Sequence, residues 1–520
     1  MTELTLKTGL KLLGDKAFEK VHAGAIDLIK KRLDDPLPYF LLGVIASEHR
    51  NHGKALELFE QAATYEPRNI CYIAHHAKQL SAMGRQNAAK TVADKAAKLQ
   101  VDDAYIADTI GVVYSRAGYH KDAIPLFEKA VGFNPRQANF YYNLGASAQF
   151  IGDFKTAKTA YEKALNLDKS FYRAWSSLIS LSKQTPDTNH YETLKSLFEA
   201  AVGDAEGQLQ LGHAIAKTLE DLSRHEESLD WLLAGKKAKR SQLRYDRIVG
   251  QALLEAAKQT SATPSKPETN YAQDTPILIV GLPRTGTTLV DRILSSHPDV
   301  VSAGELNMFA ELIKEETGTD SNLVMDTKTF QEAAHLDLAR VGKSYIDNTK
   351  DRAGDSKYMI DKMPLNFFYA GLIHRALPNA RIIALRRGAM DSCLSNFRQL
   401  FSTQYSYYNY TFDLEDTAWF YRQFDDLMSH WRATIPQDRF IEVRYEDIIF
   451  GQENQTRRLL DFCGLDWDDA CMRFHENTAP VSTASSVQVR QPLYSGSIGR
   501  WKKYGDKLDG LKAALGNLAD

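Results

Sequence analysis

The chain has 520 residues, of which 43% are hydrophobic and 25% charged, and its formal net charge is −2. This length predicts two or three domains, and the near-neutral charge argues against general binding to nucleic acid or an anionic membrane. No segment approaches the roughly 20 apolar residues that span a bilayer, and charges interrupt the N-terminal apolar residues, unlike a secretory leader. The four cysteines form no CxxC pair, which argues against a disulfide framework or a zinc site. We therefore expect a reduced cytoplasmic protein.

In the first half of the chain, small residues recur every 34 positions. One register consists of Gly43, Ala77, Gly111 and Gly145, and three further registers keep the same period: Ala55, Ala89, Ala123 and Ala157; Ala62, Ala96, Ala130 and Ala164; Phe59, Ala93, Phe127 and Tyr161. Gly84, Gly118 and Gly152 mark the turns between helices. This period is typical of tetratricopeptide repeats, in which small residues let two antiparallel helices approach closely.

The repeat pattern weakens at both ends. Residues 8–36 resemble a degenerate or capping unit, and Ala216, Ser228, Leu232 and Gly235 suggest one more unit after an irregular insertion. Residues 257–274 are polar, contain proline and lack helical periodicity, so they are expected to be a linker. We predict a helical array over residues 1–256 and a catalytic domain over 275–520. The array either binds a peptide or protein on its concave surface, or it only scaffolds or dimerises the second half.

In the second half, apolar strands alternate with amphipathic helices. Strands are predicted at 276–280, 358–360, 381–385 and 440–443, and helices near 286–296, 365–376, 389–401, 415–434 and 452–464. Such alternation favours an α/β domain whose parallel sheet is covered on both faces.

The segment PILIVGLPRTGTT (276–288) is the most informative in the chain. Its buried strand leads into a turn bracketed by Gly281 and Gly286 and then into a helix. Backbone N–H groups and a helix N-terminus that meet at one point favour a bound phosphate-like anion. The Gly-x4-Gly spacing matches a nucleotide P-loop, but Thr287 stands where a P-loop carries lysine.

The longer segment GLPRTGTTLVDRILSSHPDVVSAGE (281–305) resembles the 5′-phosphosulfate-binding segment of sulfotransferases. Bacterial tetratricopeptide-repeat sulfotransferases and tyrosylprotein sulfotransferases are the most similar, and the resemblance covers residues 276–505. It implies a P-loop-like α/β fold, 3′-phosphoadenosine 5′-phosphosulfate as donor, adenosine 3′,5′-bisphosphate as product, and no metal.

The resemblance also implies roles for individual residues. Glu305 corresponds to the proposed base that takes the proton of the acceptor hydroxyl, and Lys362 to the lysine near the bridging oxygen. Arg284 would place a cation beside the sulfuryl group. Donor binding is expected from Pro283, Arg284, Thr285, Gly286, Thr287, Thr288, Arg387, Ser395, Tyr445, Ser485, Ser497 and Arg500.

Within that set, Arg387 and Ser395 match the 3′-phosphate site, and Tyr445 matches a tyrosine that lies against the adenine. Near the C-terminus the sequence departs from cytosolic sulfotransferases, because Ser495 and Gly496 replace a basic pair. The basic contacts to the 3′-phosphate that this segment would supply are thus missing, and Ser485, Ser497 and Arg500 are the candidates that remain in it.

Two other functions compete with sulfuryl transfer. A P-loop kinase would need the loop lysine and a magnesium-binding aspartate, neither of which the sequence supplies. A repeat scaffold without catalysis is the other alternative. The acceptor stays open between protein tyrosine, sugar, lipid and small phenol, and a homodimer is one expectation for the assembly. The tyrosine-rich run 401–414 is either an acceptor-binding lid or an interface with the array.

Overall fold

The computed structural model describes residues 4–243, 245–261, 275–321, 323–354, 356–403, 406–477, 479 and 488–519. Two compact units divide between Ala174 and Trp175, inside helix α11 (Tyr172–Leu181). The predicted array ends later, at residue 256, so helices α12–α15 belong to the second unit by their contacts. The assignment of residues 1–256 to one domain stays a prediction, and most of the predicted linker (262–274) lies outside the described residues.

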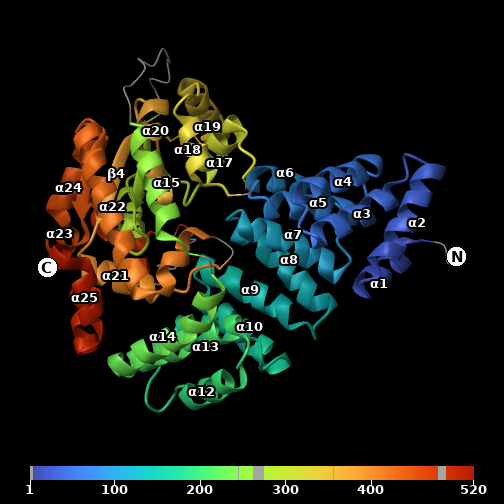
Figure 1. Cartoon of the computed structure of the whole chain (residues 1–520), viewed down its shortest axis with the longest axis horizontal. Helices are drawn as coiled ribbons and strands as arrows, with labels where there is room; N and C mark the ends of the chain where they lie inside the picture. Colours follow the sequence, from blue (N-terminus) through green and yellow to red (C-terminus); the bar gives the residue numbers. More distant parts are fainter. Residues whose placement is uncertain are drawn as a thin grey trace. The chain divides into compact units, whose positions relative to one another are not determined.

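The first unit is built from paired helices (Figure 1). They are α1 (Leu6–Gly14), α2 (Phe18–Lys31), α3 (Pro36–Glu48), α4 (His52–Tyr65), α5 (Ile70–Ala82), α6 (Gln86–Ala97), α7 (Ala104–Arg116), α8 (His120–Phe133), α9 (Ala138–Ile151) and α10 (Phe154–Leu167). A Cβ on Gly111 would lie 2.7 Å from the Phe127 ring, and the same close approach recurs between Gly43 and Phe59 and between Gly145 and Tyr161. Gly84, Gly118 and Gly152 all have positive φ. The 34-residue registers therefore predicted the packing correctly.

In the second unit, α12 (Tyr191–Ala200), α13 (Ala205–Asp221), α14 (His225–Gln242) and α15 (Arg247–Gln259) precede the sheet. Helices α13 and α14 pack so closely that a Cβ on Gly212 would lie 2.7 Å from the Gly235 Cα. Here the predicted additional helical pair is present.

Five parallel strands form one sheet in the order β2-β3-β1-β4-β5. They are β1 (Thr275–Gly281), β2 (Val300–Ser302), β3 (Tyr358–Asp361), β4 (Arg381–Arg386) and β5 (Phe440–Arg444). Four of them were predicted within two residues at each end. Strand β2 was not predicted, because a three-residue strand is too short to show periodicity.

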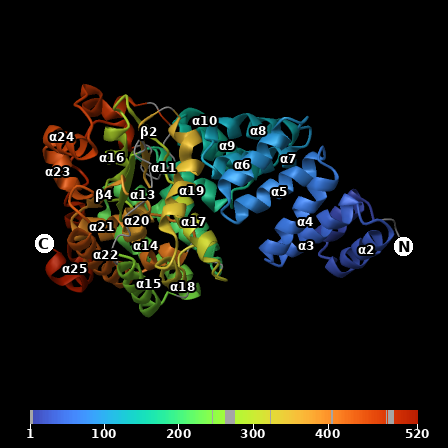
Figure 2. The same cartoon turned by 90° about the horizontal axis from the view of Figure 1, so that it is seen from above.

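Helices cover both faces of this sheet. Ile277 and Ile279 point to one face, which α16, α23 and α24 cover, whereas Leu278 and Val280 point to the other, under α15, α17, α20 and α22. In both views, β4 lies between α24 and α20 (Figures 1 and 2). The predicted covered parallel sheet is confirmed.

The remaining helices of this half include α17–α19, which the sequence had not predicted. The full set is α16 (Thr287–Leu294), α17 (Met308–Thr317), α18 (Thr327–Ala333), α19 (Leu338–Ala353), η1 (Pro364–Tyr369), α20 (Ala370–Ala376), α21 (Ala389–Phe397), η2 (Ser406–Phe412), α22 (Leu414–Thr434), α23 (Tyr445–Phe450), α24 (Gln452–Cys463), η3 (Asp469–Glu476), η4 (Gln488–Arg490), η5 (Arg500–Leu508), α25 (Asp509–Leu515) and η6 (Gly516–Leu518), where η marks 3-10 helix. Within the described ranges, no helix has the length and apolar character that crossing a membrane requires.

Candidate active site

Three neighbouring strands end at the same edge of the sheet, and most of the predicted site residues follow them. In the sheet register, Leu278 of β1 pairs with Asp361 of β3, and Gly281 pairs with Leu385 of β4. The anion loop (residues 281–288) follows β1, Lys362 follows β3, and Arg387 follows β4. Because the strands are parallel, these segments share the carboxyl edge, where open α/β sheets bind their ligands.

The anion loop has the backbone geometry of a tight turn. Gly281 has a φ of 145°, Arg284 of 68° and Gly286 of 103°. A positive φ at a non-glycine residue such as Arg284 is uncommon and often marks a functional site. The Thr285 hydroxyl donates to the Leu282 carbonyl at 2.7 Å, which stabilises the turn. Helix α16 starts directly afterwards at Thr287, so its N-terminus, the positive end of the helix dipole, lies at this edge.

Tyr445 lies against the anion loop. A Cβ on Gly286 would come within 2.6 Å of the Tyr445 Cδ2 atom, so only glycine fits there. The Tyr445 hydroxyl and the Ser497 hydroxyl are hydrogen-bonded at 2.7 Å, and burial raises the pKa of Tyr445. Tyr445 thus follows β5 directly and lies beside the loop, and its predicted contact with adenine stays a prediction.

Arg387 connects the anion loop to the C-terminal segment. Its Nη1 donates to the Arg284 carbonyl at 3.0 Å and its Nη2 to the Ser497 carbonyl at 2.6 Å, and its guanidinium lies 5.0 Å from the centre of the Tyr445 ring. The neighbouring Arg386 instead pairs with Asp425 and Glu442. The two adjacent arginines therefore have different partners, and only Arg387 contacts the anion loop.

Positive charge is concentrated around the loop. The pKa of Arg284 falls to about 10, first because the side chain is buried and then because Arg398 and Arg387 are close. Arg398 is paired with Glu220, so Arg284 and Arg387 are the two cations beside the loop that favour an anionic partner. Ser395, the other predicted 3′-phosphate contact, lies half-buried on α21, two residues before Phe397 ends that helix.

Glu305 and Lys362 form an ion pair at this edge. The Lys362 ammonium donates to Glu305 Oε1 at 2.5 Å. The lysine side chain is 1% exposed and the glutamate side chain 36%, so the carboxylate is the more exposed member of the pair. The Lys362 backbone N–H also donates to the Gly304 carbonyl at 2.9 Å, which fixes the loop that carries Glu305.

Asp361 supports this pair, and the sequence analysis did not identify it. Its buried carboxylate accepts from the Tyr345 hydroxyl at 2.8 Å, from Asn366 Nδ2 at 3.3 Å and from the backbone N–H of Leu306 at 3.3 Å. Burial raises the pKa of Asp361 to about 7. Its position just before Lys362 in the IDKMP segment was the only sequence signal, and an apolar strand end rarely reveals such a contact.

Part of the aromatic run 401–414 is connected to the anion loop by a chain of hydrogen bonds. The Tyr410 hydroxyl donates to Asn396 Oδ1, and Asn396 Nδ2 donates to the Pro283 carbonyl, both at 2.8 Å. The ring of Tyr410 also stacks on Phe420, with 3.9 Å between the ring centroids. Residues 404 and 405 lie outside the described residues, and the choice between lid and interface stays open.

The C-terminal segment contacts residues at the same edge of the sheet. Asp391 of α21 accepts from the backbone N–H groups of Gly499 at 2.6 Å and of Trp501 at 3.2 Å. Trp501 packs against the main hydrophobic core. Arg500 donates to Glu220, a residue that the sequence analysis did not single out. Ser485 lies outside the described residues.

Residues 276–469 match the sulfotransferase family, and residues 46–206 match the N-terminal tetratricopeptide-repeat region of Psidin. The chain carries a sulfotransferase-family domain behind tetratricopeptide repeats. It is 26% identical to an uncharacterized protein of Aquifex aeolicus over 370 residues, which are 68% of this chain and 47% of that protein. Protein-tyrosine sulfotransferase 1 of Danio rerio is 24% identical over 257 residues, 44% of this chain and 67% of that enzyme.

The chain thus spans about half the length of the Aquifex protein. Among solved structures, the sulfotransferase domain from the Synechococcus PCC 7002 olefin synthase is 18% identical, with a TM-score of 0.34, and covers 46% of this chain and 91% of its own.

Proposed function

We propose that this protein is a sulfotransferase that uses 3′-phosphoadenosine 5′-phosphosulfate as donor and an acceptor hydroxyl as substrate. The observation that carries the proposal is the position of Arg387. It contacts the anion loop at Arg284 and the closing segment (residues 497–504) at Ser497. A donor with a phosphate at one end and a phosphosulfate at the other carries several negative charges, which suit a site with guanidinium groups and a helix N-terminus. The sulfotransferase-family match over the same residues supports this assignment.

In the proposed site, the anion loop holds the phosphosulfate. Backbone N–H groups at the start of α16 and the hydroxyls of Thr287 and Thr288 bind its oxygens, and Arg284 lies beside the sulfuryl group. Pro283, Thr285 and Gly286 shape the loop. Arg387 and Ser395 bind the 3′-phosphate, and Tyr445 and Ser497 lie along the nucleotide. Ser485 and Arg500 are the other two residues expected to contact the donor.

The reaction is an in-line transfer. The acceptor oxygen forms a bond to sulfur while the bond between sulfur and the bridging phosphate oxygen breaks, and adenosine 3′,5′-bisphosphate leaves. Glu305 accepts the proton of the acceptor hydroxyl. Lys362 and Arg284 stabilise the charge that develops on the departing oxygen. An ammonium has three donors, so Lys362 can contact Glu305 and that oxygen together. No metal enters this scheme.

We rank a tyrosine hydroxyl in a peptide or protein first among acceptors, because several relatives are protein-tyrosine sulfotransferases. The repeat array suits this choice, since paired helices of this kind present a concave surface to a polypeptide. A purely scaffolding or homodimerising array is the alternative, and sedimentation of the purified protein distinguishes a monomer from a dimer.

The test is transfer of labelled sulfate from the donor to a panel containing a tyrosine peptide, a sugar, a lipid and a small phenol. Label that appears in an acceptor with the wild type but not with Glu305→Gln supports the proposal. Donor that stays intact with every acceptor, together with phosphate transfer from ATP and magnesium, would replace it with a kinase.

A further inference from the structure

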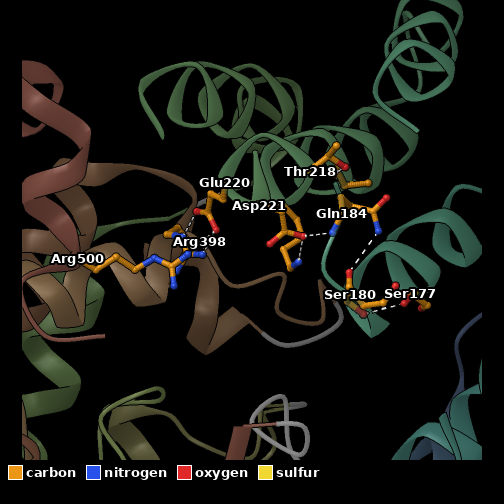
Figure 3. Close-up of polar contacts among 11 residues, drawn as sticks. Ser177, Ser180, Gln184, Thr218, Glu220, Asp221, Arg398 and Arg500 are labelled. Atoms are coloured by element: carbon orange, nitrogen blue, oxygen red, sulfur yellow. Dashed lines mark hydrogen bonds and ion pairs between the residues drawn. The ribbon is translucent and has the colours of Figure 1, made fainter. Parts of the chain in front are cut away.

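A buried carboxylate in helix α13 holds two arginines of the catalytic half. Glu220 lies in the last turn of α13 and its side chain is 3% exposed. It accepts hydrogen bonds from Nε and Nη2 of Arg398, from Nη2 of Arg500 at 2.9 Å, and from the Tyr504 hydroxyl. Figure 3 shows Arg398 and Arg500 converging on Glu220. Every lone-pair direction of this carboxylate is thus directed at the catalytic half.

The contacts of Glu220 have the form of a strong charged network. Arg398 binds through two parallel donors, which is the most directional arrangement between a guanidinium and a carboxylate. Burial alone would raise the pKa of Glu220, but the charges of Arg398 and Arg500 and the hydrogen bonds lower it to about 2. The carboxylate is therefore ionised at neutral pH, and removing it leaves two partly buried cations without this partner.

Both arginines belong to segments that build the proposed donor site. Arg398 directly follows α21, the helix that carries Ser395 and whose Asn396 holds the Pro283 carbonyl of the anion loop. Arg398 is also close enough to Arg284 to affect its charge equilibrium. The Glu220 contact thus fixes the end of α21 beside the loop.

Arg500 and Tyr504 both belong to the closing segment (residues 497–504). Ser497, three residues before Arg500, accepts from Arg387 through its carbonyl and pairs with Tyr445 through its hydroxyl. A single side chain on α13 therefore reaches both segments that flank Arg387.

We propose that Glu220 is a positioning residue of the donor site, which acts through Arg398 and Arg500 on α21 and the closing segment. This inference rests on the proposed function. Glu220 lies between the two family matches, which cover residues 46–206 and 276–469, so neither match identifies it. Through Glu220, helix α13 would help to set the geometry of the donor site.

The sign of the effect separates positioning from simple electrostatics. If Glu220 acted only as a negative charge near an anion site, its removal would strengthen anion binding. If it positions the arginines, its removal weakens binding, because their guanidinium groups and the closing segment lose a fixed geometry.

Asp221, the next residue, provides the matched control. Its carboxylate accepts from the Gln184 backbone N–H at 2.8 Å and from Lys217 at 2.5 Å. It points toward Gln184, whereas Glu220 points toward the two arginines (Figure 3). Asp221→Asn therefore removes a carboxylate from the same helix end without touching the donor-site segments.

The experiment is calorimetric titration of the full chain with adenosine 3′,5′-bisphosphate, accompanied by thermal unfolding of each variant. We expect Glu220→Gln to weaken binding about tenfold or more and Asp221→Asn to leave it within about twofold. Equal or tighter binding by Glu220→Gln would overturn the inference, and so would an equal loss in both variants. If the wild type itself does not bind, the proposed function fails instead.

A second variant keeps the inference testable if Glu220→Gln does not fold. Tyr504→Phe removes one donor to Glu220 and leaves both arginines in place. We expect it to weaken bisphosphate binding about threefold. Unchanged affinity in a folded Tyr504→Phe variant would then count against a positioning role for Glu220.

Discussion

Lys362 Nζ lies 2.5 Å from Glu305 Oε1, although 57 residues separate the two in the sequence. The pair joins the loop after β2 to the end of β3, and these two strands are neighbours in the sheet. Its geometry gives the two residues complementary tasks. The buried ammonium is a fixed source of positive charge, and the more exposed carboxylate can receive a proton from an acceptor.

Replacing Glu305 by glutamine should separate catalysis from binding. Glutamine has the same shape and can still accept a hydrogen bond from Lys362, but it cannot take a proton at neutral pH. We expect turnover to fall about 10²- to 10⁴-fold, while affinity for adenosine 3′,5′-bisphosphate stays within about threefold of the wild type. Initial rates with labelled donor and calorimetry measure the two quantities. Turnover that survives the substitution would remove Glu305 from the role of base.

The two adjacent arginines after β4 provide a second matched comparison. Arg387→Ala removes the link between the Arg284 and Ser497 carbonyls together with the proposed phosphate contact. We expect it to weaken bisphosphate binding about 100-fold or more, because charge-assisted contacts to phosphate are the strong ones. Arg386→Ala breaks ion pairs with Asp425 and Glu442 and a contact with the Phe424 ring, and it should bind within about threefold of the wild type. Similar losses in both variants would show that the effect is structural.

Gly286 tests the shape of the anion loop. Gly286→Ala adds a methyl group 2.6 Å from the Tyr445 ring at a φ of 103°, so we expect a loss of roughly 1–3 kcal/mol in stability and loss of bisphosphate binding. Gly118→Ala is the control, since Gly118 has a φ of 84° and no atom within 4 Å of the added methyl. It should cost stability through backbone strain alone and leave binding intact. Normal binding by folded Gly286→Ala would contradict the proposed loop geometry.

Asp361 should make stability depend on pH. Its folded-state pKa of about 7 lies above the ordinary value of 3.8 because the carboxyl is buried. The unfolded chain therefore loses this proton first, and the folded state is destabilised progressively as the pH rises from about 4 to about 7, after which the effect is constant. The charged or titratable groups around it are Tyr345, Lys362 and Glu305.

Asp361→Asn cannot titrate, so its stability relative to the wild type should increase between pH 5 and pH 7. The upper bound of this change is about 2–3 kcal/mol, at about 1.4 kcal/mol per pH unit. Thermal unfolding of both proteins over this range measures it. A difference in stability that does not vary with pH would contradict the raised pKa.

The sequence predicted the features that depend on local pattern. Repeating small residues placed the helix pairs, because a Cβ on Gly111 would collide with Phe127. Buried apolar runs placed four strands, and the glycines of residues 281–288 placed the loop. Contacts between distant segments could not be predicted in this way. Glu220 and Asp361 sit at helix and strand ends without any periodic signal, and only the fold shows that they contact Arg398 and Leu306.

The central claim is that this chain binds a sulfonucleotide at the carboxyl edge of its sheet. Calorimetric titration of the wild type with adenosine 3′,5′-bisphosphate in the absence of magnesium tests it most directly, with Arg387→Ala in parallel. The account predicts tight binding by the wild type that Arg387→Ala abolishes. Absence of binding by the wild type, with binding of ATP and magnesium in its place, would contradict it.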